Sequence, residues 1–126
     1  MTLTDSALSI SDVAAETGLS TSTLRYYEQE GLLLDEVGRA SSSHRRYAPE
    51  VVGWLTFITR LRSTGMPIRD IRRYAELVRQ GEHTTPDRLE LLVAHRERVL
   101  EQLAEAQRSL AAIDYKISSY ERFSTK

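Results

Sequence analysis

The chain of 126 residues contains no cysteine, so it cannot form disulfides, a thiolate metal site, or a cysteine nucleophile or redox switch. Glycine and proline are also scarce, and the formal net charge is only -1, which argues against a disordered chain or a fibrous repeat. No stretch approaches the roughly 18 consecutive apolar residues that a membrane span needs. The first residues lack the basic start and apolar core of a secretion signal. We therefore expect a folded cytoplasmic protein.

The arginines that are present are unevenly distributed. Residues 37–73 hold eight arginines but only two acidic residues, and the compensating acids lie mostly at 12–36 and beyond 81. This arrangement predicts a local basic field despite the nearly neutral whole chain. Ordinary arginines on a solvated helical face are the alternative interpretation.

Glycine and proline divide the first part of the chain into short helices. Ser11 is predicted to cap a helix over 12–17 that Gly18 ends. A second helix is predicted from about 20 to 30. The shared core of this pair is predicted to contain Ile10, Val13, Ala14, Leu19, Leu24, Tyr27 and Leu32.

Residues 32–47 show no helical period, and a two-stranded wing fits their pattern of apolar, serine-rich and basic residues. Two further helices are predicted from Pro49 to Gly65 and from Pro67 to Gly81. The third helix would turn Leu61 or Arg62 to its apolar side. Residues 1–81 would then form one domain, with a helix-turn-helix at about 10–29 and a wing at about 32–47.

The second helix and the wing carry the residue types that suit DNA. Small hydroxyls can approach base edges, and arginine or a phenol suits phosphate oxygens. The outward positions predicted for the second helix are Ser22, Thr23, Arg25 and Tyr26. The wing adds Arg39, His44, Arg45 and Arg46, where a duplex backbone or minor groove could be reached.

After Pro86 no glycine or proline interrupts the chain, and apolar residues recur in alternating steps of three and four. A helix over 87–121 would be about 52 Å long, too long for the small N-terminal domain to cover. Residues 82–126 are therefore predicted to form a coiled-coil dimerisation helix, rather than a helix that folds back on its own domain. The predicted seam contains Leu89, Leu92, Arg96, Val99, Leu103, Ala106, Leu110, Ile113, Ile117 and Tyr120.

Several short motifs now stand out. They are Ile-Ser-Asp-Val-Ala at 10–14, Gly-Leu-Ser at 18–20, Thr-Leu-Arg-Tyr-Tyr-Glu at 23–28, Gly-Leu-Leu at 31–33, Arg-Arg-Tyr at 45–47, Phe-Ile at 57–58 and Gly-Met-Pro-Ile-Arg-Asp-Ile at 65–71. Together they resemble the MerR family of transcriptional regulators over nearly the whole chain. The resemblance implies a mainly α protein: a winged helix-turn-helix, a second helix pair that also touches DNA, and an antiparallel coiled-coil homodimer.

The family resemblance also implies a mechanism and contact residues. Members commonly bind a near-palindromic promoter and distort it so that RNA polymerase can engage both of its recognition elements. The DNA-contacting roles implied for this chain fall on Thr23, Arg25, Tyr26, Arg45, Tyr47 and Arg60. At 43–47 the chain reads Ser-His-Arg-Arg-Tyr where the family usually has Gly-Tyr-Arg-x-Tyr, so its wing turn departs from the pattern.

Other functions find less support in the residues. Metal-, aldehyde- and thiol-sensing relatives use cysteines that this similar chain lacks, and the seam ends too near residue 126 for the ligand domain of drug-sensing relatives. The three histidines, His44, His83 and His95, have no metal-ligand spacing. We therefore predict no catalytic residues, no metal and no cofactor, and no residue pattern identifies a small-molecule effector. The alternative function is a helical protein-protein interaction module that uses the same seam.

Overall fold

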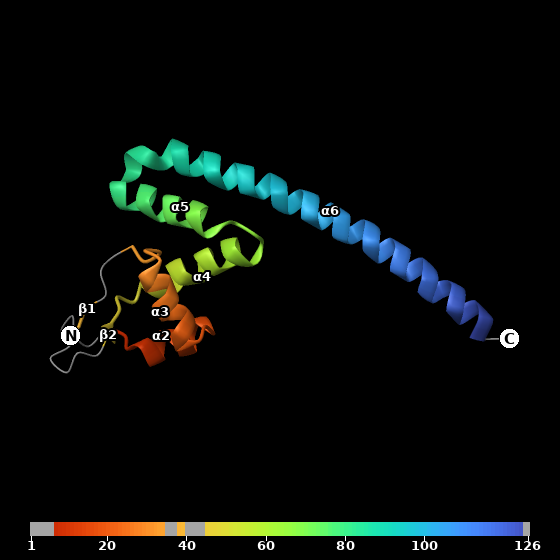
Figure 1. Ribbon diagram of the computed structural model, residues 1–126, viewed down its shortest axis with the longest axis horizontal. Coiled ribbons are helices and arrows are strands. Elements are labelled where there is room, and N and C mark those ends of the chain that lie inside the picture. The colour runs from red at the N-terminus through yellow and green to blue at the C-terminus, as the bar shows by residue number, and fades with distance from the viewer. Residues whose placement is uncertain (1–6, 35–37, 40–44, 125–126) are drawn as a thin grey trace. The chain divides into compact units, whose positions relative to one another are not determined.

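The computed structural model describes residues 7–34, 38–39 and 45–124, and confirms a mainly α fold with a long C-terminal helix (Figure 1). Contacts within the chain divide it into two units, residues 1–89 and residues 90–126. In chain order the elements are α2 (Ile10–Thr17), α3 (Thr21–Gln29), β1 (Gly38–Arg39), β2 (Arg45–Arg46), α4 (Val51–Ser63), α5 (Ile68–Gln80), the short 3-10 helix η1 (Glu82–Thr84) and α6 (Thr85–Ser124).

The N-terminus of α2 is fixed by a capping box. The Asp12 backbone N–H donates to Ser9 Oγ, and the Ser9 N–H donates to the Asp12 carboxylate, both at 3.1 Å. The prediction that Ser11 caps this helix is wrong, because only Ser9 has an acidic residue three positions later to complete the reciprocal pair. Gly18 ends the helix as predicted, in the left-handed conformation with φ 75°.

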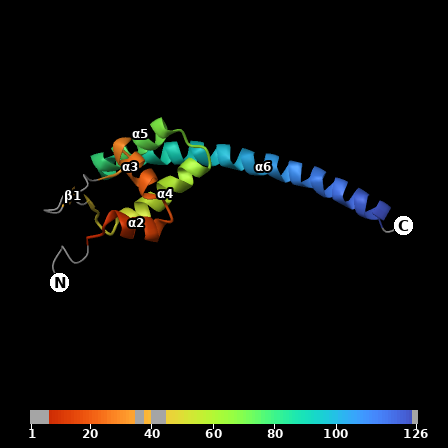
Figure 2. The same cartoon turned by 60° about the horizontal axis from the view of Figure 1, so that its bottom comes forward.

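The helix pair α2–α3 has the predicted core. Ser20 caps α3 by accepting from the Thr23 N–H at 3.0 Å. The side chains of Val13, Leu24, Tyr27 and Leu32 are all buried. The other predicted core residues, Ile10, Ala14 and Leu19, are half-buried. Helix α2 packs against both α3 and α4, and the three helices lie together in both views of the ribbon (Figure 2).

Helix α4 begins at Val51, two residues later than predicted. The N–H groups of Val51 and Val52 reach back only three residues, to the carbonyls of Ala48 and Pro49, so the chain enters the helix through a tight turn. Leu61 is buried and Arg62 exposed, which decides between the two positions left open by the sequence.

Helix α5 buries Ile71, Ala75 and Leu77. Its C-terminal end is tied to η1 by Thr84, whose buried hydroxyl bonds the carbonyls of Leu77 at 2.6 Å and Gly81 at 2.7 Å. A carbonyl at the end of a helix has no partner within the helix, so this hydroxyl satisfies groups that would otherwise need water.

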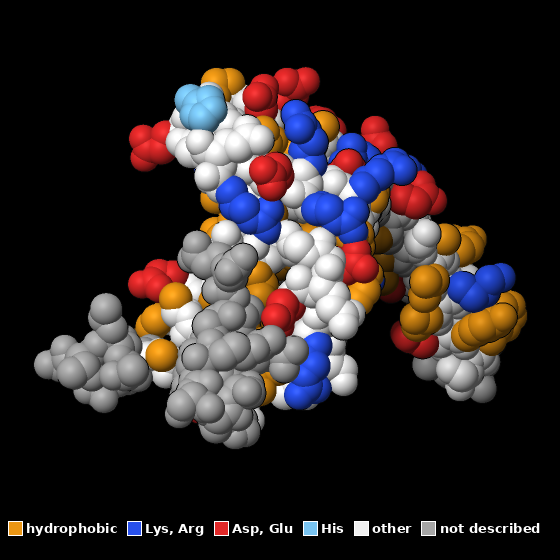
Figure 3. All heavy atoms as spheres, turned by 60° about the vertical axis from the view of Figure 1, so that its left-hand side comes forward, with side chains coloured by type: hydrophobic (Ala, Val, Ile, Leu, Met, Phe, Trp, Pro, Cys, Tyr) orange, Lys and Arg blue, Asp and Glu red, His pale blue; other side chains and the backbone are white. Residues whose placement is uncertain are grey.

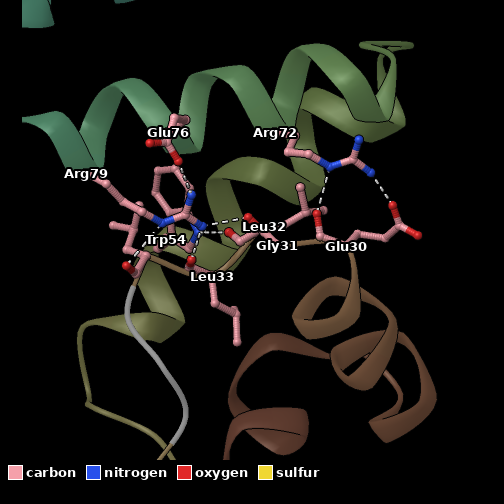
Figure 4. A network of polar contacts seen from close by, with 9 residues as sticks. Glu30, Gly31, Leu32, Leu33, Trp54, Arg72, Glu76 and Arg79 are labelled. Atoms are coloured by element: carbon pink, nitrogen blue, oxygen red, sulfur yellow. Dashed lines mark hydrogen bonds and ion pairs between the residues drawn. The ribbon is translucent and has the colours of Figure 1, made fainter.

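Side chains of α4 and α5 hold the segment after α3 by donating hydrogen bonds to its backbone carbonyls (Figure 4). Arg72 of α5 donates from Nε to the Glu30 carbonyl at 2.9 Å and also pairs with the Glu30 carboxylate. Trp54 of α4 donates its indole N–H to the Leu32 carbonyl at 2.6 Å, and its ring stacks on Tyr74 of α5. Side chains from two helices thus hold the chain where it leaves α3.

Arg79 of α5 completes this set of contacts. Its guanidinium donates to the carbonyls of Gly31 at 2.6 Å, Leu33, and Leu34 at 3.3 Å, and pairs with Glu76 at 3.1 Å (Figure 4). With Arg72 and Trp54, it gives all five successive carbonyls of residues 30–34 a side-chain donor. We name this arrangement the carbonyl clamp.

Replacing Arg79 by Ala should lower the free energy of unfolding by roughly 2 to 3 kcal/mol, because several carbonyls lose a charged donor at once. Arg79→Lys should recover less than half of this loss, since an ammonium group cannot present the planar fork of donors. Chemical denaturation followed by the emission of Trp54 measures both, because Trp54 is the single tryptophan of the chain.

The matched control is Arg73→Ala, an exposed arginine on the same helix, which should change stability by no more than about 0.5 kcal/mol. Equal losses for the Arg73 and Arg79 variants would show that the clamp contributes nothing specific.

Candidate nucleic-acid interface

One face of α3 is polar and open to solvent. Ser22, Arg25 and Tyr26 are exposed there, as predicted. Thr23 is half-buried, and its oxygen accepts from the Ser20 hydroxyl at 2.9 Å. A threonine hydroxyl that accepts one hydrogen bond keeps its own hydrogen for donation, so Thr23 stays chemically able to bond a base or phosphate.

Tyr26 links this face to α4. The guanidinium carbon of Arg62 lies 5.5 Å from the centroid of the Tyr26 ring, within the range of a cation–π contact. Arg62 was not predicted as a site residue, because 36 positions separate it from Tyr26 and only the folded chain brings the two together. Helices α3 and α4 therefore bring a second arginine to the exposed ring of Tyr26.

Arg60 is exposed in the last turn of α4, as is Arg62. Cations at a helix C-terminus are stabilised by the partial negative charge there, so both arginines also have a structural reason to occupy these positions. Their exposure leaves the guanidinium groups accessible to a polyanion.

The basic residues counted in the sequence do not all contribute to an open basic surface. Arg72 pairs with Glu30, which lies outside the window of residues 37–73. Figure 3 shows basic and acidic side chains intermixed on the face in view, rather than one continuous basic area. The basic field predicted from residues 37–73 is therefore weaker than the simple count. Arg60 and Arg62 are exposed members of it, and Arg25 of α3 is exposed outside it.

The wing is present as two short antiparallel strands, in which Gly38 pairs with Arg46 and Arg39 with Arg45. Next to it, Tyr47 and Leu8 exchange two backbone hydrogen bonds of 2.8 Å. The Tyr47 side chain is only 3% exposed, so in this conformation it packs at the base of the wing and does not present a surface to DNA. The side chains of Arg39, Arg45 and Arg46, and all of His44, lie outside the described part of the chain.

Helix α6 runs unbroken over 40 residues and carries a stripe of exposed apolar side chains. Hydrophobic side chains of this helix are visible on the face drawn in Figure 3. The predicted seam residues Leu89, Leu103, Leu110, Ile113, Ile117 and Tyr120 are each about half exposed or more. Leu92 and Val99 are half-buried, whereas their neighbours Val93 and Leu100 are exposed, and Ala106 is exposed as well.

Within the described ranges, no group of three or more His, Asp or Glu side chains is placed to hold a metal ion. Of the helices described, none is both long enough and apolar enough to cross a membrane.

Two family models match the chain and overlap in its middle. Residues 8–77 match the model described as MerR HTH family regulatory protein, and residues 52–115 match the model described as MerR, DNA binding. Between them they cover α2 to α5, the wing and most of α6.

Individual relatives agree with these models. An uncharacterised HTH-type transcriptional regulator of Haemophilus influenzae is 38% identical over 109 residues, 86% of this chain and 80% of that protein. The HTH-type transcriptional regulator AdhR of Bacillus subtilis is 36% identical over 94 residues, 75% of this chain and 66% of that protein. These relatives are regulators rather than enzymes.

A solved structure extends the likeness to three dimensions. The crystal structure of HiNmlR, a MerR family regulator lacking the sensor domain, bound to promoter DNA, superposes with a TM-score of 0.81 at 35% identity, covering 92% of this chain and 91% of that one.

The two adjacent tyrosines of α3 offer a test of which side of the helix faces solvent and which side packs against the core. Tyr27 is 3% exposed and its hydroxyl lies 3.5 Å from Thr59 Oγ1, so Tyr27→Ala should cost roughly 3 to 5 kcal/mol of folding stability. Tyr26→Ala should cost less than about 1 kcal/mol, because its ring is 37% exposed. Thermal denaturation of both variants checks this, and equal losses would contradict the orientation of α3.

Proposed function

Because the chain belongs to the MerR family of HTH transcriptional regulators, we propose that it binds a near-palindromic promoter as a homodimer and regulates transcription by distorting that DNA. The open face of α3 carries this proposal, since it combines hydroxyls, a phenol and an arginine on one capped helix. Additional support comes from the promoter DNA in the structure of the relative HiNmlR.

The proposed contacts divide into two kinds. Ser22 and Thr23 lie in the first turn of α3, where short hydroxyl side chains can reach base edges in a major groove. Arg25, Tyr26 and Arg60 contact phosphates and hold the helix in place. To this set we add Arg62, because its guanidinium makes a cation–π contact with the Tyr26 ring.

The wing supplies a second group of contacts. We propose that Arg39, His44, Arg45 and Arg46 reach the backbone or minor groove beside the recognition helix. Tyr47 supports them from the base of the wing, where its backbone pairs with Leu8 and its ring is buried.

The homodimer forms through residues 82–126, with the two α6 helices antiparallel. The contacts proposed from the sequence are Leu89, Leu92, Val99, Leu103, Ala106, Leu110, Ile113 and Ile117. A two-fold axis relates two recognition helices, as a near-palindromic site requires.

The distorted promoter is then engaged by RNA polymerase. Residues 1–81 make the DNA-binding part.

Arg25→Ala should weaken binding to all duplex sequences, roughly tenfold, and reduce the slope of log affinity against log salt by about two, because each of the two chains of the dimer loses one phosphate contact. Thr23→Ala should instead change the preference among base pairs at particular operator positions, since base contacts specify and phosphate contacts position. Binding titrations with the protein's own upstream promoter at several salt concentrations measure both.

Arg108→Ala is the matched control, an exposed arginine on α6 that pairs with Glu105 and lies off the predicted seam, and it should leave affinity and salt slope unchanged. If wild-type protein binds the promoter no better than unrelated duplex at moderate salt, the interaction-module alternative is favoured instead.

Leu103→Asp should dissociate the dimer, because it places a charge from each chain in the apolar seam, at a cost on the order of several kcal/mol. Sedimentation should then show a monomer, and specific binding to the palindrome should be lost. Tyr115→Asp is the control, because Tyr115 is exposed on the same helix but lies off the predicted seam. A Leu103→Asp variant that remains dimeric and binds normally would place the subunit interface elsewhere.

A further inference from the structure

The first turn of α3 holds two hydroxyl side chains that are bonded to each other. The Thr23 N–H donates to Ser20 Oγ at 3.0 Å, and the Ser20 hydroxyl donates to Thr23 Oγ1 at 2.9 Å. Ser20 thus contacts both the backbone and the side chain of the same residue. Capping a helix requires only the first of these two hydrogen bonds, so the second is not explained by the cap.

We propose that Ser20 is a positioning residue that sets base specificity: it holds the Thr23 hydroxyl as a hydrogen-bond donor, and so selects a base that presents an acceptor in the major groove. The inference rests on the proposed function, in which Thr23 contacts a base edge. It adds to that function a residue that acts through Thr23 and does not itself touch DNA.

The hydrogen bond from Ser20 decides what Thr23 can offer a base. A hydroxyl has one hydrogen and two lone pairs. At Thr23 one lone pair is occupied by the Ser20 hydrogen, and among the described residues no acceptor takes the hydrogen of Thr23. A hydroxyl that accepts a hydrogen bond is also polarised into a stronger donor. Thr23 is therefore biased to donate to DNA rather than to accept from it.

Other hydroxyls near the turn lack this arrangement. Thr17 Oγ1 donates to the Val13 carbonyl at 2.7 Å and accepts from the Leu19 N–H at 3.2 Å, so its hydrogen is already used within the protein. Ser22 is exposed, and no side-chain hydrogen bond holds its hydroxyl within the part of the chain that the structure describes. Such a hydroxyl can rotate to donate or to accept, whichever a base requires. Of these three residues, Thr23 alone combines a held oxygen with an available hydrogen.

The major groove distinguishes a donor from an acceptor. Guanine and thymine present only acceptors among their hydrogen-bonding groups there, cytosine presents only a donor, and adenine presents one of each. A donating Thr23 therefore favours guanine or thymine over cytosine on the strand that it contacts. Which base pair binds best depends on which strand that is, whereas the dependence of the choice on Ser20 does not.

Three variants of Ser20 keep a residue suited to an N-cap and differ in what they offer the Thr23 hydroxyl. Ser20→Thr keeps both hydrogen bonds. Ser20→Gly removes the hydroxyl and leaves Thr23 to rotate. Ser20→Asp still accepts from the Thr23 N–H, but a carboxylate has no hydrogen to give. The Thr23 hydroxyl then donates to the carboxylate and presents only lone pairs to the base.

Binding titrations measure the preference at every position of a half-site, when each position of the protein's own upstream promoter is varied through the four base pairs. Thr23→Ala identifies the position that Thr23 reads. There, Ser20→Thr should keep the wild-type order and Ser20→Gly should weaken the preference. Ser20→Asp should lower it roughly fivefold or more and favour the base pair with its two bases exchanged. Ratios between base pairs are compared, because an added carboxylate repels every duplex alike.

Ser22→Ala is the matched control, because it removes a hydroxyl from the same turn. It should change the preference at a different position of the half-site, and the Ser20 variants should leave that position as in the wild type. In a Thr23→Ala background, Ser20→Asp should no longer change any preference, since the hydroxyl through which Ser20 acts is absent.

A wild-type order of base pairs at the Thr23 position in both Ser20→Gly and Ser20→Asp would overturn the proposal, even if the overall affinity fell. An equal change at all positions would also overturn it, because a loosened helix gives that result, and so would unchanged preferences in Thr23→Ala. If thermal denaturation shows that Ser20→Asp does not fold, Ser20→Gly decides alone.

The wild type separates this proposal from the proposed function. Specific promoter binding whose base preferences do not depend on Ser20 overturns only the role of Ser20. Binding to the promoter that is no tighter than binding to unrelated duplex overturns both.

Discussion

Five successive backbone carbonyls, those of residues 30–34, need hydrogen-bond donors at the point where the chain leaves α3, and the packing of α4 and α5 against this segment meets that need. A segment that is neither helix nor strand cannot satisfy its own polar groups, so other elements must. Trp54 of α4 and Arg72 and Arg79 of α5 do so. Because these donors come from the second helix pair, the end of α3 is fixed relative to α4 and α5. The contact between Tyr26 and Arg62 follows from this placement.

The arginines of this chain consequently do two different things. Arg72 and Arg79 hold the backbone, where the planar fork of donors matters more than net charge. Arg25, Arg60 and Arg62 are exposed, where charge can act on a polyanion over a distance set by salt. A count of basic residues along the sequence does not distinguish these two roles. They can be told apart only by the groups that each guanidinium contacts in the folded chain.

The sequence predicted those features that depend on neighbouring residues. Gly18 as a helix end, the start of α3 near Ser20 and the length of α6 follow from local backbone preference and apolar period. The predictions were weaker where two local signals compete, as when Ser9 rather than Ser11 caps α2. Contacts between residues far apart in the sequence had no local signal at all. The carbonyl clamp, the contact of Arg62 with Tyr26 and the pairing of Tyr47 with Leu8 each join positions tens of residues apart.

In the proposed dimer, the apolar stripe of α6 affects DNA recognition by setting the distance between the two DNA-binding units, and not only by stabilising the dimer. In an antiparallel pair, the position of the two-fold axis along the helix sets how far apart the two N-terminal ends of α6 lie. A slip of one heptad changes that separation by about 10.5 Å, the length of about three base pairs. The half-sites of a palindrome have a fixed spacing, so a dimer of equal stability in the wrong register would fail to place both recognition helices.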